Sequence, residues 1–192
     1  VRRWLPIGPV RLHAAMLLLP AVMILVPQLS RAGQIGVVTA LAAIFAIQPD
    51  FGATLALAAA FLSSRAAQSD HVVTAIGAAV SLMAVAITSL RPDPLEPVAF
   101  VERVVPDAFA TNAMLGVLIG AALLFACVAP LFVQPANARG ARSFAGVMAG
   151  FALASTIGPY PVPLSGYGAS SILGYALALA LLRVSIVPSK AG

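Results

Sequence analysis

Seven long apolar segments follow one another along this chain, separated by short stretches that contain proline, glycine or charged residues. They cover residues 12–29, 33–47, 51–64, 72–90, 113–133, 143–157 and 170–186. Of the 192 residues, 61% are hydrophobic and 9% are charged, whereas soluble domains carry about 25% charged residues. Apolar segments of this kind are typical of transmembrane helices. The sequence therefore predicts an all-α, polytopic transmembrane helical bundle of about seven spans, in which residues 1–192 form a single integral membrane domain.

The distribution of charge excludes nucleic acid as a partner and favours one orientation in the membrane. The formal net charge is +5, but the basic residues are scattered singly between apolar segments and do not form a basic face. Six of the 11 Lys and Arg residues fall in the loops on the side of the C-terminus, so the positive-inside rule predicts a cytoplasmic C-terminus. The single cysteine, Cys127, lies in an apolar segment, which excludes a disulfide within the chain.

A proline-rich loop interrupts the apolar sequence near the C-terminus. Residues 158–168 contain three prolines and three glycines between two apolar segments, so they cannot form a regular helix. Such a loop must lie at the membrane interface or line a cavity that satisfies its backbone. The hydroxyl groups of Ser165, Tyr167, Ser170 and Ser171 favour a cavity that binds a substrate. The alternative is a tight turn whose serines cap the last helix.

A second polar interruption, Gln48-Pro49-Asp50, separates two apolar segments and is called the QPD turn below. Asp50 is costly in lipid unless it reaches water or a cationic partner, so it is a candidate binding residue together with Gln48. The alternative is that Asp50 only caps the next helix. His13 lies near the end of the first apolar segment, where it could be a ligand or a proton carrier. We expect it to be solvated instead, as a lone interfacial histidine usually is, since no second His or Cys is placed to share a metal with it.

The loop 91–111 holds four of the six acidic residues, including Glu102 and Asp107, beside Arg91 and Arg103. Acid–base chemistry and diphosphate binding are the roles that these side chains suit. Within the loop, residues 98–105 have the pattern of a short amphipathic helix on the membrane surface. The alternative for Glu102 and Arg103 is an adjacent ion pair on that helix, without catalysis.

Three stretches resemble motifs of the SEDS family, the RodA/FtsW-type peptidoglycan glycosyltransferases. Residues 161–171, PVPLSGYGASS, are similar to the family's PLPF-[IV]-S-Y-G-G-S-S signature, with Gly166 as an insertion and Ala169 in place of a glycine. Residues 47–55, IQPDFGATL, resemble the family's QPDLGTAL motif. Residues 2–4, RRW, with Gly8, resemble the start of a third motif, whose QPSE is replaced here by residues 13–16, HAAM.

The resemblance implies that the chain corresponds to the last seven of the family's ten spans. Because the chain opens on Val1, we expect either an alternative start codon or residues upstream of it. The implied activity is polymerisation of peptidoglycan from lipid II in the bacterial inner membrane, for cell shape or division. A class B penicillin-binding protein is the implied partner, and a divalent metal such as Mg²⁺ would suit the pyrophosphate.

The resemblance also assigns roles to particular residues. Glu102, followed by Asp107, lies nearest to the family's catalytic aspartate in the loop before the fifth span. The predicted substrate-binding residues are Gln48, Asp50, Arg91, Arg103, Ser165, Tyr167, Ser170 and Ser171. The loss of QPSE and the shortened loop favour an alternative, a non-catalytic scaffold or a module that binds the lipid carrier. A small transporter is a third hypothesis, motivated by Asp50 and the broken helices.

Overall fold

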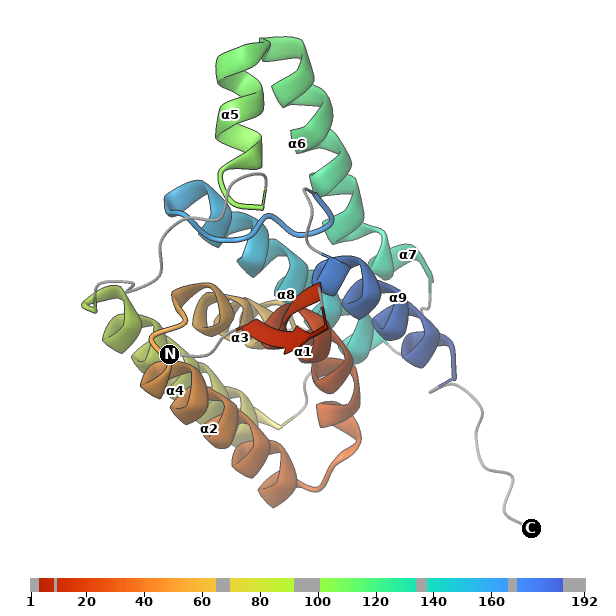
Figure 1. Cartoon of the computed structure of the whole chain (residues 1–192). Helices are drawn as coiled ribbons and strands as arrows, with labels where there is room; N and C mark the ends of the chain where they lie inside the picture. The colour runs from red at the N-terminus through yellow and green to blue at the C-terminus, as the bar shows by residue number, and fades with distance from the viewer. Residues whose placement is uncertain are drawn as a thin grey trace.

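The structure is a computed structural model that describes residues 4–8, 10–64, 70–91, 101–133, 138–165 and 169–184. It is mostly helical, with one small antiparallel sheet (Figure 1). The strands are β1 (Trp4–Ile7) and β2 (Val10–His13). The helices are α1 (Ala14–Leu25), the 3-10 helix η1 (Val26–Gln28), α2 (Arg31–Ile47), α3 (Phe51–Ser64), α4 (His71–Ser89), α5 (Val104–Thr111), α6 (Ala113–Val128), α7 (Pro130–Val133), α8 (Ala138–Ile157) and α9 (Ala169–Val184).

A helix lies in each of the seven predicted apolar segments, with three differences at their ends. The first segment begins as strand β2, so its helix starts at Ala14 and ends in η1. The fifth segment is broken between α6 and α7, where Pro130 removes a backbone donor. The sixth begins five residues earlier than predicted, at Ala138.

The predicted surface helix over residues 98–105 is wrong for the part that the structure describes. Val101 lies in a turn and Glu102 in an isolated β-bridge, and helix α5 begins only at Val104. Residues 98–100 lie outside the described residues. The start at Val104 places Pro106 in the first turn of α5, where its missing N–H costs no helical hydrogen bond.

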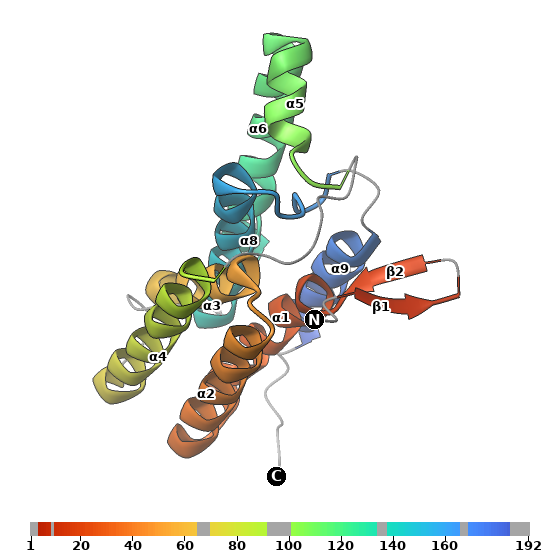
Figure 2. The ribbon, with the colours of Figure 1, turned by 60° about the vertical axis from the view of Figure 1, so that its left-hand side comes forward.

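Helix α3 is the centre of the bundle and packs between α4 and α8 (Figure 2). Its buried positions are mostly small residues, including Gly52, Ala53, Ala56 and Ala60. Gly150 of α8 faces the backbone of Ala56, so a side chain there would collide with α3. Small residues on both helices therefore allow their backbones to approach closely.

Two of the described helical stretches are long and apolar enough to cross a membrane, His71–Ser89 and Ala113–Phe132. The other apolar helices are shorter: α3, with 14 residues, is about 21 Å long at 1.5 Å per residue, against about 30 Å of bilayer hydrocarbon. Helix α8 is long enough, with 20 residues, but it is not among the candidates, so length and composition together identify two candidate spans among the seven predicted.

Helices α5 and α6 form an arm that projects from the rest of the bundle in both views (Figures 1 and 2). The two helices pack against each other, and Phe109 of α5 lies against Gly116 of α6. The C-terminal part of the arm continues into α7, which packs against α8. The arm thus begins beside Glu102, returns towards the bundle through α6 and joins α8.

Candidate functional site

The QPD turn places Asp50 at the start of α3, inside the protein. The carboxylate is 3% exposed and accepts a hydrogen bond at Oδ1 from the backbone N–H of Ala53, at 3.0 Å. Asp50 therefore caps α3, which was the alternative considered for it. Its second oxygen, Oδ2, lies 3.6 Å from Nε2 of His13, so the same carboxylate also faces a cationic or polar partner in the interior.

His13 joins three elements of the fold at this point. Its Nδ1 accepts a hydrogen bond from the backbone N–H of Met16 at 3.4 Å and so caps α1. Its backbone N–H donates to Oγ of Ser170 at 2.6 Å. Because Nδ1 is an acceptor, the neutral ring carries its proton on Nε2, the nitrogen that faces Asp50.

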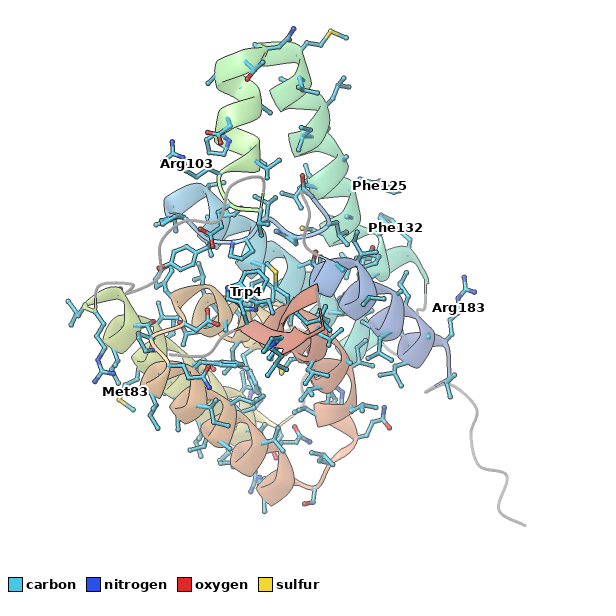
Figure 3. All side chains as sticks on the ribbon, viewed as in Figure 1. Trp4, Met83, Arg103, Phe125, Phe132 and Arg183 are labelled. Atoms are coloured by element: carbon cyan, nitrogen blue, oxygen red, sulfur yellow. The ribbon has the colours of Figure 1, made fainter. Side chains whose placement is uncertain are left out.

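The expectation that His13 is solvated is wrong: the residue is 3% exposed. The reason is the hairpin of β1 and β2, which pairs Trp4 with His13. The indole ring meets the imidazole edge to face, with ring centres 5.1 Å apart. Figure 3 shows Trp4 on this hairpin, which lies in front of the bundle in this view. The indole ring of Trp4 therefore shields His13, which the sequence alone predicts to be exposed to water.

The proline-rich loop lies against both the QPD turn and the segment that carries Glu102. Tyr160 contacts Phe51, the residue after Asp50, with ring centres 5.5 Å apart. Pro161 forms an antiparallel β-bridge with Glu102, and the N–H of Val162 donates to the carbonyl oxygen of Val101 at 3.1 Å. This end of the bundle, called the site end below, therefore brings together three segments that are far apart in the sequence.

The serines predicted to bind substrate have structural hydrogen bonds. Ser170 and Ser171 are buried in the first turn of α9. Oγ of Ser171 accepts from the N–H of Leu164 at 3.0 Å, as Ser170 does from His13. Both hydroxyls thus hold neighbouring segments against α9. Ser165 is partly buried in the loop, and Tyr167 lies outside the described residues.

Two further predicted binding residues lie where α2 and α4 end. Gln48 is the C-cap of α2, and its N–H donates to the carbonyl oxygen of Ile44. Arg91, just after α4, donates from Nη1 to the carbonyl oxygen of Ala46 at 3.1 Å. An arginine at a helix C-terminus satisfies a carbonyl group and complements the helix dipole. Arg91 thus links α4 to α2 at the site end.

Of the two predicted catalytic acids, Glu102 is the one that adjoins the proline-rich loop. Asp107 lies on the exposed side of α5, where Oδ1 is 3.7 Å from Nε of Arg103. Arg103 itself has a left-handed backbone, with φ of 61°, which is unusual for a residue with a side chain. This conformation turns the chain from the β-bridge at Glu102 into helix α5. Figure 3 shows Arg103 at the base of the arm.

Sequence reasoning missed His13 and Trp4 as members of this site. The signal was available in the dipeptide Gly8-Pro9, which is typical of a turn and which lies midway between Trp4 and His13. Gly8 has φ of +60° in that turn, a conformation that glycine adopts without cost. Within the part of the chain that the structure describes, no group of three His, Cys, Asp or Glu residues is placed to hold a metal ion.

Comparisons of this chain with protein-family models, with curated proteins and with solved structures found no match.

Proposed function

We propose that the chain is a multi-pass protein of the bacterial inner membrane, with about seven spans and a cytoplasmic C-terminus. The two long apolar helices support a membrane location. A second support is that large apolar side chains point outwards from several helices, as Met83, Phe125 and Phe132 do in Figure 3. Polar residues such as Thr54, Ser81 and Thr88 are buried instead. A surface of this kind suits lipid better than water.

The function that the geometry supports best is that of a SEDS-like protein handling lipid II, or a related polyprenyl-diphosphate sugar, in peptidoglycan synthesis. One observation carries this proposal. The two motifs that resemble the family, one around Asp50 and one ending in Ser170 and Ser171, meet at one end of the bundle, where His13 contacts Asp50 and Ser170. Glu102, the candidate base, adjoins the same loop at Pro161. Broken helices and buried ionisable residues within a membrane bundle are typical of a functional site, which supports the proposal.

In the proposed reaction, each residue of the site end has a separate task. The 4-hydroxyl of the acceptor sugar attacks the anomeric carbon of the donor, and undecaprenyl pyrophosphate leaves. Glu102 takes the proton from that hydroxyl. Arg91 and Arg103 supply positive charge for the diphosphate; a divalent metal such as Mg²⁺, if the diphosphate brought it, would add to that charge. Asp107, paired with Arg103 on the outside of α5, positions that arginine.

The test compares Glu102→Gln with Asp107→Asn in the full chain reconstituted with lipid II, alone and with a class B penicillin-binding protein. If Glu102 is the base, we expect Glu102→Gln to reduce glycan polymerisation by at least 100-fold, the lower range for general base catalysis. Asp107→Asn removes the partner of Arg103 but not the proposed base, so it should reduce polymerisation much less than Glu102→Gln does. Equal activity of Glu102→Gln and the unaltered protein would exclude Glu102 as the base.

A second candidate function is a non-catalytic module that binds the lipid carrier or acts as a scaffold. This function is favoured because the buried polar side chains of the site already form hydrogen bonds within the protein. Asp50 caps α3, and Ser170 and Ser171 each accept a backbone N–H. Retention of lipid II by the unaltered protein, with no glycan product in the same reconstitution, would support this function over catalysis.

A further inference from the structure

A small cavity lies at the opposite end of the bundle from the QPD turn. It is formed where η1 and the start of α2 meet the end of α3 and the first turns of α4 and α8. Its volume for water-sized atoms is about 20 Å³, which is close to the space of a single water molecule. Phe61 and Met23 form part of an apolar wall, and the remaining wall is polar.

The polar wall contains a buried hydroxyl group that has no partner in the described part of the chain. Ser143 is 2% exposed, and no hydrogen bond from its side chain is found there. The neighbouring hydroxyls differ: Ser64 donates to the carbonyl oxygen of Phe61 at 3.1 Å, and Thr74 donates to that of Asp70 at 2.9 Å. A buried hydroxyl without a partner is costly, so the cavity suits an occupant that can form a hydrogen bond with Ser143.

The charge of the wall shows which kind of acceptor suits the cavity. Arg139 lines it, and none of the described lining residues is acidic. Gln34, which is buried, uses its amide Nε2 to hold the carbonyl oxygen of Leu29. A guanidinium beside a free hydroxyl donor is a combination that binds phosphate oxygens. The cavity therefore suits an anion better than a cation.

We propose that this cavity is an anion site that takes one oxygen of a phosphate group, carried either by an anionic phospholipid headgroup or by free phosphate. The volume admits one oxygen-sized atom, so the rest of the phosphate lies at the mouth of the cavity. In the proposed orientation this end faces the cytoplasm, where basic pockets between helices bind anionic headgroups. The inference depends on the proposed membrane setting, but not on the glycosyltransferase chemistry.

The experiment measures thermal unfolding of the full chain in nanodiscs of phosphatidylcholine, with and without phosphatidylglycerol. A third sample contains phosphatidylcholine and free phosphate. We expect phosphatidylglycerol to raise the unfolding midpoint, and Arg139→Gln to weaken the apparent affinity for it by about tenfold, which corresponds to one charge-assisted contact. Ser143→Ala should weaken it in the same direction.

Arg142→Gln is the matched control, because Arg142 lies three residues further along α8 and is not among the residues that line the cavity. It should keep the response of the unaltered protein. An equal loss in Arg142→Gln and Arg139→Gln would show general surface attraction and overturn the proposal, as would the absence of any shift with either ligand. A shift with free phosphate equal to that with phosphatidylglycerol would support the site and identify free phosphate as its source.

Because these measurements use no glycan assay, they separate this site from the proposed catalysis. Loss of glycan synthesis in Glu102→Gln with an intact response to phosphatidylglycerol would support both proposals. An inactive protein with an intact, Arg139-dependent response would contradict only the catalytic proposal.

Discussion

At the scale of the residue, the buried polar side chains of this protein mostly join two elements each. His13 caps α1 and meets both Asp50 and Ser170. Oγ1 of Thr54 in α3 and Oγ1 of Thr88 in α4 are 2.9 Å apart and share a hydrogen bond. In an apolar surrounding an unsatisfied polar group is costly, so these pairs fix how the helices sit against one another.

His13→Ala should destabilise the protein by about 2 kcal/mol, because it removes the cap of α1 and leaves the Asp50 carboxylate facing an empty space. His13→Asn is the control, since asparagine is a good helix cap, and it should recover about half of the loss. Unfolding of the purified protein in detergent measures both. An alanine variant as stable as the unaltered protein would show that the histidine contributes nothing to this junction.

Asp70 makes the stability of the other end of the bundle depend on pH. Its carboxylate accepts two hydrogen bonds from the Arg31 side chain, at 2.7 and 2.9 Å, and others from the first N–H groups of α4. The bond from Arg31 is the main cause that holds the pKa of Asp70 well below its usual range, followed by the N–H of Val73. The folded state therefore favours the ionised carboxylate.

The sign of the pH effect follows from that lowered pKa. The stabilisation is present above the unfolded pKa of about 4 and is lost as the pH falls towards the lower folded value. Unfolding midpoints measured between pH 7 and pH 3 should therefore drop less in Asp70→Asn than in the unaltered protein. Parallel curves for the two proteins would show that Arg31 and Asp70 are not paired in solution.

At the scale of the element, the contact of α3 with α8 depends on the absence of side chains. A Cβ on Gly146 would collide with the carbonyl oxygen of Ala59, and one on Gly150 with the backbone of Ala56. Neither glycine is needed for an unusual backbone conformation, since both lie within a regular helix. Their role is to bring two helices close together.

Gly150→Ala should therefore destabilise the protein by about 1–3 kcal/mol, the usual cost of overpacking a core. Gly36→Ala in α2 is the control, because a Cβ at that position meets no atom within 4 Å. It should stabilise the protein by up to about 1 kcal/mol through the higher helix propensity of alanine. Denaturant unfolding of both variants provides the measurement, and a neutral Gly150→Ala would contradict the close packing.

At the scale of the whole molecule, an apolar core is surrounded by faces that also expose large apolar side chains. Exposed large apolar side chains occur on α2, α4, α6 and α9 in particular: Ile44, Ile47, Val72, Leu82, Met83, Met114, Val117, Leu118, Leu124, Phe125, Ile172, Leu173, Leu177 and Val184. The arm of α5 and α6 carries several of them beyond the rest of the bundle (Figure 2). Hydrocarbon is the solvent that such a surface suits.

The proposed topology predicts opposite locations for two parts of the chain. A fluorescent protein fused to the C-terminus should fluoresce, because the proposed topology puts that end in the cytoplasm. Alkaline phosphatase fused within residues 92–100 should be active, because the same topology puts that loop outside. The Lys and Arg residues are divided almost evenly between the two sets of loops, so fusions test the orientation more directly than the charge distribution does. The reverse pattern would place the site end in the cytoplasm and remove its access to extracellular glycan.

The sequence by itself determined where the helices lie and where they are interrupted. Long apolar runs give helices, and clustered proline and glycine end them, because both effects depend on local backbone chemistry. The QPD turn and the described part of the proline-rich loop, residues 158–165, were predicted in this way. Strands β1 and β2 were not, since a two-stranded hairpin is marginal without packing against something else.

Only the tertiary structure shows that the polar breaks between helices, such as the QPD turn and the proline-rich loop, lie next to each other. His13 and Ser170 are 157 positions apart, and no local propensity specifies a hydrogen bond over that separation. The contact depends on α9 packing against α1, where Gly174 lies against the carbonyl oxygens of Met16 and Leu17. The sizes of the side chains at helix contacts therefore determine which polar residues meet. The reason is that a close-packed interior allows few arrangements of the same helices.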